Sequence, residues 1–162
     1  MKTEARDFAI AAHGDQKYGR HPYYVHLDAV AKIAAGYGET AEIIAYLHDV
    51  VEDTNVVLSE IEDKFGWLVS EAVGILTDEP GKNRKERKAK TYAKMARVSG
   101  HAEIALVVKA ADRLANMRAC LDDNNKELLA MYKAEHATFK EAVYRPNACN
   151  EIWSELESIF NA

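Results

Sequence analysis

Hydrophobic residues recur every three or four positions along most of the chain, the spacing that gathers side chains on one face of an α-helix. Six segments show the pattern clearly: residues 25–37, 43–51, 65–76, 104–111, 128–139 and 152–160. No alternation of apolar and polar residues, the pattern of a half-buried strand, continues beyond four positions. The three prolines fall between these segments, where a missing backbone N–H interrupts no helix. The pattern predicts an all-α fold, a compact bundle of about seven or eight helices.

Length and composition are those of one globular domain. The 162 residues match the size at which a chain buries one hydrophobic core. We therefore expect a single domain over residues 1–162, in which C-terminal helices at about 125–160 complete the bundle. Cys120 and Cys149 lack the spacing of a metal site or a disulfide framework, which is typical of free thiols in a reducing compartment.

Charge and hydropathy exclude several classes of partner. A formal net charge of -5 is unlike that of a nucleic-acid coat or a polybasic membrane binder. The N-terminus has no apolar leader, and no apolar run approaches the roughly 20 residues that a bilayer requires. We expect a cytoplasmic protein that binds a small molecule and neither nucleic acid nor membrane, with its oligomeric state left open.

A group of polar residues next to an apolar segment is the sharpest chemical signal. His48 and Asp49 end such a segment, and Glu52 and Asp53 follow directly. Spacings of three and four residues allow all four side chains to crowd one side of a helix. Three carboxylates and an imidazole in that position repel one another unless a cation compensates, and an unpaired buried carboxylate is costly. A metal ion accounts for both features.

Asp112 repeats this anomaly at the end of a second, strongly apolar segment. The ordinary explanation is that the His48–Asp49 pair caps a helix and that Asp112 forms an ion pair with Arg113 or Arg118. Two such anomalies in one small domain favour a shared site over two unrelated ones.

These stretches together resemble the HD superfamily of metal-dependent phosphohydrolases, whose metal ligands follow the series His, His-Asp, Asp. Within it the chain resembles the hydrolase domain of the Rel/SpoT alarmone enzymes, and most of all the stand-alone small alarmone hydrolases. Residues 48–54 (HDVVEDT) and 111–118 (ADRLANMR) carry the specific part of the likeness, which extends over about residues 5–120. We expect a hydrolase that acts without the further domains of the long enzymes.

The resemblance implies one metal ion, Mn²⁺, with Fe²⁺ or another divalent metal as the alternative. Its implied ligands are His26, His48, Asp49 and Asp112. Two imidazoles and two carboxylates suit an octahedral Mn²⁺ or Fe²⁺ ion. The resemblance also implies that Glu52 and Asp53 orient and deprotonate the attacking water. The implied reaction removes the 3′-pyrophosphate of ppGpp or pppGpp and releases pyrophosphate with GDP or GTP.

Five more residues are candidates for contact with the nucleotide: Lys17, Tyr18, Asn116, Arg84 and Lys88. Asn116 matches a family position near the sugar. Lys17 and Tyr18 stand where many long Rel enzymes carry Arg-Lys, and the Tyr18 ring offers a surface for purine stacking. This departure puts the base in doubt, so adenine alarmones such as ppApp are alternative substrates. Arg84 and Lys88 belong to a basic run that is either a solvated helix face or an electropositive rim that attracts the nucleotide.

Two other functions remain open. The same four ligands would serve another HD enzyme, such as a 5′-nucleotidase or a phosphodiesterase. A non-catalytic HD module would bind an alarmone without turning it over, although the intact Glu52 and Asp53 favour an enzyme. Replacing Asp53 with Asn separates an enzyme from a binding module. The enzyme loses turnover and keeps its metal, whereas binding by the module changes little.

Two further polar positions favour structural roles. Tyr132, Glu135 and Phe139 share one face of a predicted helix, which is more typical of a core than of a nucleotide pocket. His13 lies on a helix face with Phe8, and we interpret it as packing or as support for the site.

Overall fold

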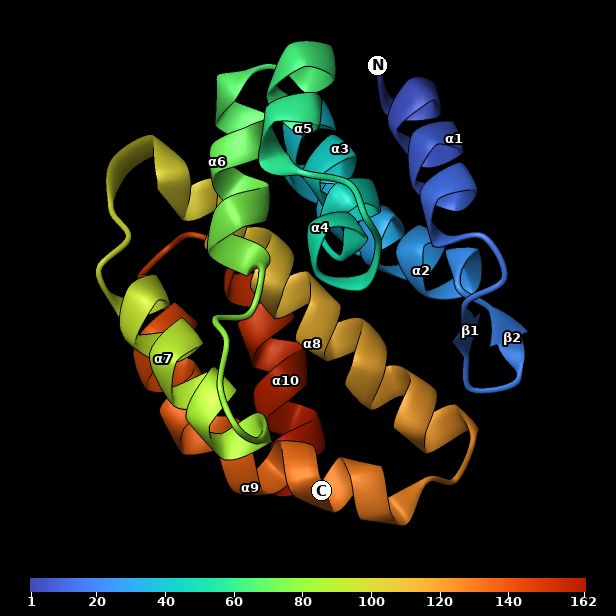
Figure 1. Cartoon of the computed structure of the whole chain (residues 1–162). Coiled ribbons are helices and arrows are strands. Elements are labelled where there is room, and N and C mark those ends of the chain that lie inside the picture. Colours follow the sequence, from blue (N-terminus) through green and yellow to red (C-terminus); the bar gives the residue numbers. More distant parts are fainter.

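Helices make up almost all of the regular structure in the computed structural model, which describes residues 1–162 (Figure 1). In chain order they are α1 (Lys2–His13), α2 (Tyr24–Ala34), α3 (Glu39–Leu47), α4 (Val50–Asp53), α5 (Leu58–Phe65), α6 (Trp67–Leu76), α7 (Arg84–Ala96), α8 (Ile104–Asp122), α9 (Lys126–Val143) and α10 (Asn150–Asn161). Two 3₁₀ turns, η1 (Ala35–Tyr37) and η2 (Gly100–Glu103), and two short strands, β1 (Lys17–Tyr18) and β2 (His21–Pro22), complete the fold. The predicted all-α fold is confirmed. No helix has both the length and the apolar character needed to cross a bilayer.

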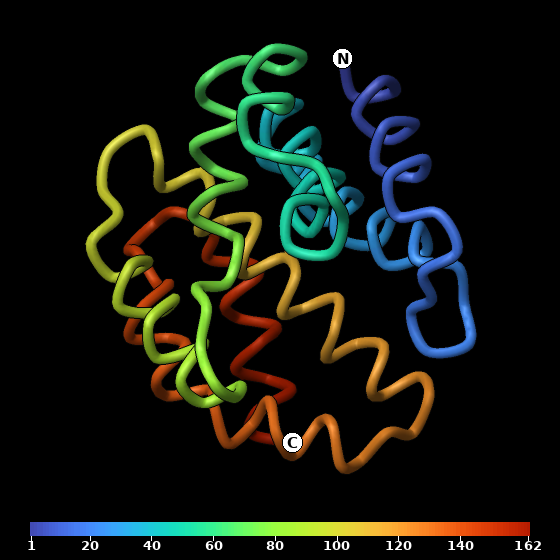
Figure 2. The backbone as a smooth tube through the Cα atoms, viewed as in Figure 1, coloured from blue at the N-terminus to red at the C-terminus, as the bar shows by residue number.

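The longest helix, α8, runs through the middle of the bundle and packs against α2, α3, α6, α9 and α10 (Figure 2). Thirteen of its 19 residues are buried, as expected for a helix with neighbours on several sides. Leu114 and Met117 of α8 are fully buried, as are Leu27 of α2 and Ile44 of α3. Burial of each such side chain stabilises the fold by about 1.5–3 kcal/mol. This core therefore fixes α8 relative to α2 and α3; His26 lies on α2, Asp112 lies on α8, and His48 directly follows α3.

A bend separates α3 from α4 and adds a helix that periodicity did not predict. The apolar pattern indicated one helix over residues 43–51, whereas α3 ends at Leu47 and α4 begins at Val50. Asp49, between them, has φ −105° and ψ 0°, a conformation outside the helical region. Helical hydrogen bonding resumes where the Asp53 N–H donates to the Asp49 carbonyl at 2.9 Å. The bend turns His48 and Asp49 toward α2 and α8.

The strands form a two-stranded antiparallel ribbon between α1 and α2 (Figure 1). Lys17 pairs with Pro22 and Tyr18 with His21, and Gly19 in the connecting turn has a φ of +58°. That left-handed conformation is accessible to glycine without a steric penalty, which permits a tight turn. The ribbon places the Tyr18 side chain next to α8.

Candidate functional site

Four polar side chains from distant parts of the chain meet between α2, the α3–α4 bend and α8. Asp112 Oδ1 lies 3.0 Å from His26 Nε2 and 3.2 Å from His48 Nε2. Asp49 Oδ2 lies 3.0 Å from His48 Nε2 and 4.0 Å from His26 Nε2. Both imidazoles are only 3% exposed. The four predicted ligands thus converge on one point, although His26 and Asp112 are 86 residues apart in sequence.

The atoms of this cluster fit a divalent cation. His48 Nδ1 donates to the Ala45 carbonyl at 2.6 Å, so in that tautomer the lone pair of Nε2 faces the cluster. Nε2 is buried and has no hydrogen-bond partner of its own. One ligand atom from each of His26, His48 and Asp49 lies within 4.8 Å of the others, and the Asp112 carboxylate lies beside them. Imidazole nitrogens and carboxylate oxygens are the donors that Mn²⁺ and Fe²⁺ accept.

The charged groups in and beside the cluster shift the pKa values of Asp112 and His48. Burial opposes ionisation of Asp112, but Lys109 and His48 outweigh it and hold the pKa of that carboxyl well below its usual range. Burial also opposes protonation of His48, yet Asp49 and Asp112 outweigh it and raise the pKa of the imidazole. Positive charge is therefore favoured between these two carboxylates, and a divalent ion would supply it in place of protons.

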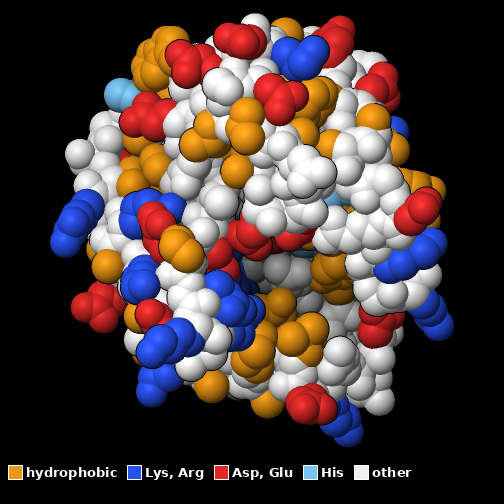
Figure 3. Space-filling model, in the orientation of Figure 1, with side chains coloured by type: hydrophobic (Ala, Val, Ile, Leu, Met, Phe, Trp, Pro, Cys, Tyr) orange, Lys and Arg blue, Asp and Glu red, His pale blue; other side chains and the backbone are white.

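The cluster opens into a cleft with a volume of about 240 Å³. Acidic side chains gather in the hollow at the centre of the face in Figure 3, and basic side chains lie next to it. The charged residues that line the cleft are Asp49, Glu52, Arg84, Lys88, Lys109, Asp112 and Arg113. Acids and bases thus share one small polar cleft, which suits an anionic ligand bound next to a cation.

The two predicted catalytic carboxylates occupy different places. Glu52 lines the cleft, and its Oε1 accepts a hydrogen bond from the backbone N–H of Asp78 at 2.7 Å. Asp53 lies outside the cleft lining, and its Oδ2 accepts from Gln16 Nε2 at 3.0 Å. Partial burial raises the pKa of both carboxyls, and those hydrogen bonds offset only part of the shift. A raised pKa makes a carboxylate a better proton acceptor near neutral pH.

Three of the predicted nucleotide-contacting residues lie on or near the ribbon and α8. The Tyr18 hydroxyl donates to Asn116 Oδ1 at 2.6 Å, and its ring stacks on His26 with centroids 4.5 Å apart and planes at 9°. Both Tyr18 and Asn116 line the cleft. Lys17 is exposed and lies outside the cleft, beside a separate cavity that also borders Gln16. The cleft geometry therefore gives no support to Lys17 as a contact.

The other two candidates, Arg84 and Lys88, line the cleft from α7, and each is held by an acid. Arg84 donates to both carboxylate oxygens of Glu135, at 2.9 and 3.2 Å. Lys88 Nζ donates to both oxygens of Asp78, at 3.0 and 2.8 Å. These two cations are therefore part of the cleft wall rather than of a solvated helix face.

Sequence reasoning missed several residues of the cleft. Tyr132 packs against the core, as expected, but it also lines the cleft, which its spacing did not predict; burial raises the pKa of its phenol to about 12. Phe139 on the same helix is fully buried, as expected. Tyr23 donates to Asp49 Oδ2, and Lys109 donates to Asp112 Oδ2 at 3.3 Å. A lysine inside a strongly apolar segment, three residues before a predicted ligand, was the available signal for Lys109.

His13 contacts the site indirectly, through Gln16. It is buried, and its Nδ1 lies 2.8 Å from Oε1 of Gln16, the side chain that contacts Asp53. This placement agrees with its interpretation as packing or support for the site.

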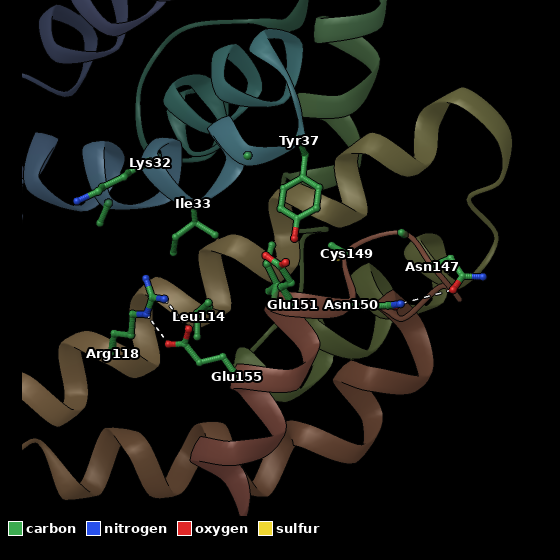
Figure 4. Close-up of a pocket in the computed structure, with 14 residues that line it drawn as sticks. Lys32, Ile33, Tyr37, Leu114, Arg118, Asn147, Cys149, Asn150, Glu151 and Glu155 are labelled. Carbon is green, nitrogen blue, oxygen red and sulfur yellow. Dashed lines mark hydrogen bonds and ion pairs between the residues drawn. The ribbon is translucent and has the colours of Figure 1, made fainter.

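A larger cavity of about 670 Å³ opens between α2, α8 and α10 (Figure 4). Its lining mixes apolar side chains such as Ile33 with polar ones, and no histidine is among them. Arg118 and Glu155 face each other across its wall in a bidentate pair, with both N–O distances at 2.6 Å. That pair satisfies its own charges, and the group of side chains that could hold a metal ion lies at the smaller cleft, which is therefore the candidate site.

Comparison with known proteins places this arrangement in a family. Residues 5–146 match a family model described as the HD domain. The chain is 33% identical over 122 residues to guanosine-3′,5′-bis(diphosphate) 3′-pyrophosphohydrolase MESH1 of Danio rerio, covering 71% of this chain and 66% of the relative. It is 35% identical over 166 residues to the guanosine-3′,5′-bis(diphosphate) 3′-pyrophosphohydrolase of Vibrio cholerae, covering 96% of this chain and 22% of the relative.

The solved structures agree with the sequence comparison. A structure described as a metazoan ortholog of SpoT that hydrolyzes ppGpp matches with a TM-score of 0.83 and 26% identity, over 99% of this chain and 93% of that one. This chain spans between about a fifth and two thirds of the length of the two curated relatives. With a family model matched over most of its length and its four-residue cluster in place, the chain belongs to the HD domain family.

Proposed function

We propose that this protein is a Mn²⁺-dependent hydrolase that removes the 3′-pyrophosphate of ppGpp or pppGpp, releasing pyrophosphate with GDP or GTP. The activity named for its relatives in Danio rerio and Vibrio cholerae supports the substrate. One observation carries the proposal: a donor set for a divalent cation shares a cleft of about 240 Å³ with four cationic side chains. A diphosphate ester is the kind of substrate that needs both.

The residues of the cleft divide the chemistry between them. A divalent ion held by the four-residue cluster would acidify a water and offset charge on the phosphoryl oxygens. Glu52 lines the cleft beside the cluster and would accept a proton from the attacking water, while the Asp78 N–H keeps its carboxylate in place. Asp53, held by Gln16, would help to orient that water. Positioned proton transfer of this type contributes about 10²–10⁴-fold to a rate.

The opposite wall of the cleft binds the pyrophosphate. The pKa of Lys88 is lowered, because burial and the repulsion of Lys109 outweigh its ion pair with Asp78. Asp78, in contrast, has a lowered pKa because Lys88 outweighs the effect of burial. A phosphate bound beside Lys88 would offset the repulsion between the two lysines and favour the charged form of Lys88. Both Lys88 and Lys109 line the cleft, which supports an anion site beside them.

Either purine is compatible with the residues at the nucleoside end. One face of the Tyr18 ring rests on His26, and a base would stack on the opposite face. The Asn116 amide contacts Tyr18 and Asp112, a support that is independent of the base. The proposal therefore includes ppApp beside ppGpp as a substrate.

Product analysis tests the proposal. Metal-stripped protein is incubated with ppGpp and with ppApp, with and without Mn²⁺, and the nucleotide and phosphate products are separated. We expect Mn²⁺-dependent release of pyrophosphate with GDP or ADP. Orthophosphate release from other nucleotides, with both alarmones intact, would identify a different HD phosphohydrolase.

A matched pair of variants separates an enzyme from a binding module. Asp53→Asn should abolish most turnover and retain Mn²⁺, while Asp63→Asn, an exposed aspartate of α5, should behave as wild type. Alarmone binding without turnover in the wild type would identify a non-catalytic module and refute the proposed hydrolase.

A further inference from the structure

A closed ring of contacts spans the ribbon, α8 and α2. Its members are Tyr18, Asn116, Asp112 and His26. The Tyr18 hydroxyl donates to Asn116 Oδ1 at 2.6 Å, and Asn116 Nδ2 donates to Asp112 Oδ1 at 3.3 Å. The same Asp112 oxygen lies 3.0 Å from His26 Nε2. The His26 ring lies flat against the Tyr18 ring, with 4.5 Å between centroids. Two of the four cluster residues are therefore linked through one tyrosine.

The two histidines of the cluster are oriented by different means. His48 is fixed by a hydrogen bond from Nδ1 to the Ala45 carbonyl. The His26 ring has Asp112 as its one hydrogen-bond partner, so no backbone group sets its plane. Two tyrosine rings pack against it instead. The plane of the Tyr18 ring lies at 9° to that of His26, and the Tyr23 ring meets His26 edge-on, with 61° between the planes. Partners outside the coordination sphere usually orient a ligating histidine through its second nitrogen, and here the Tyr18 ring takes that place.

We infer that Tyr18 is a positioning residue for the metal ligands of this protein. Its ring sets the plane of His26, and its hydroxyl, through the Asn116 amide, holds the Asp112 carboxylate. The inference rests on the proposed function only in requiring that the cluster binds a divalent ion. It also ties the ribbon to the metal centre, since Tyr18 lies on β1 and no other residue of that strand lines the cleft.

Three variants test the inference by Mn²⁺ affinity, which is independent of turnover. Tyr18→Leu removes both the stacking and the hydrogen bond, whereas Tyr18→Phe keeps the ring. Tyr144→Leu is the control, because Tyr144 is a partly exposed tyrosine that packs on Trp153, outside the cleft. Each metal-stripped protein is titrated with Mn²⁺, and the free ion is measured by electron paramagnetic resonance. Thermal unfolding shows that each variant is folded.

Tyr18→Leu should weaken Mn²⁺ binding by about 10- to 100-fold, the usual effect of losing an outer-shell partner. Tyr18→Phe should weaken it by about 2- to 10-fold, since one hydrogen bond is lost. Tyr144→Leu should match the wild type. In the turnover assay at saturating ppGpp, excess Mn²⁺ should restore most of the kcat of Tyr18→Leu, while the KM for ppGpp stays elevated because the ring is also the proposed stacking surface for the base.

Wild-type Mn²⁺ affinity in a folded Tyr18→Leu variant would overturn the inference and leave the proposed function intact. A wild-type protein that binds no Mn²⁺ or other divalent ion would overturn both together.

Discussion

Replacing Lys88 with Gln removes one cation from the cleft and leaves Asp78 without its partner. The Lys88 ammonium contacts both carboxylate oxygens of Asp78, and the two side chains are only 14% and 13% exposed. A hydrogen bond to a charged group contributes about 1.5–3 kcal/mol, and removing one member of a fully buried ion pair costs about 3–5 kcal/mol. The Lys88–Asp78 pair is mostly shielded from solvent but borders the cleft, so the cost should lie below that of a fully buried pair. K88Q should therefore lower the free energy of unfolding by about 2 kcal/mol.

The double variant D78N/K88Q separates folding from binding. Two neutral amides can hydrogen-bond to each other, so the double variant should recover most of the lost stability. K88Q should raise the KM for ppGpp, and the KM should stay elevated in the double variant, since an amide cannot replace the ammonium that we propose binds phosphate. Lys85→Gln is the control, because Lys85 is an exposed lysine on the same helix.

Urea unfolding of the single and double variants gives the stability cycle, and steady-state kinetics at saturating Mn²⁺ give KM and kcat. An unchanged KM in K88Q would refute a role for Lys88 in substrate binding. Recovery of both stability and KM in the double variant would show that Lys88 acts only through the fold.

Three other predictions concern single groups. Glu52→Gln and Asp53→Asn should each lower kcat by about 10²–10⁴-fold, while Mn²⁺ affinity by electron paramagnetic resonance stays at the wild-type value. Although burial opposes it, the ion pair with Arg84 lowers the pKa of Glu135. The pair therefore stabilises the fold above the unfolded-state pKa of about 4.3, and this contribution is lost as the pH falls. Between about pH 5 and 3, the urea midpoint of Glu135→Gln should therefore change less than that of the wild type. Burial raises the pKa of Cys149 to about 11, so iodoacetamide at pH 8 should label it about 100-fold faster in urea than in the native protein.

The sequence was most informative where a polar residue interrupted an apolar pattern. Asp49 and Asp112 each stand at a position where helical periodicity calls for a hydrophobic side chain or a simple cap. Burial of such groups is costly unless something compensates, so the anomaly itself indicated a shared site. The structure brings both together with His26 and His48, within reach of a single ion.

Periodicity could not predict how side chains meet across helices. Tyr132 has the spacing of a core residue, and its ring indeed packs 4.8 Å from the Arg113 guanidinium, yet the residue also lines the cleft. A tyrosine is apolar along its ring and polar at its tip, so a core pattern does not exclude a cleft position. The break before α4 was equally hidden, because the residues on either side of Asp49 keep the apolar spacing through the bend.

The cleft holds acids and bases together without letting them neutralise each other completely. Arg84 and Lys88 would be attracted to the carboxylates of the four-residue cluster, which line the same cleft of about 240 Å³. Glu135 and Asp78 hold these two cations on the far wall instead. The cluster carboxylates therefore remain available to a divalent ion. The cations stay close enough to bind an anion beside that ion, which is the arrangement that hydrolysis of a diphosphate ester requires.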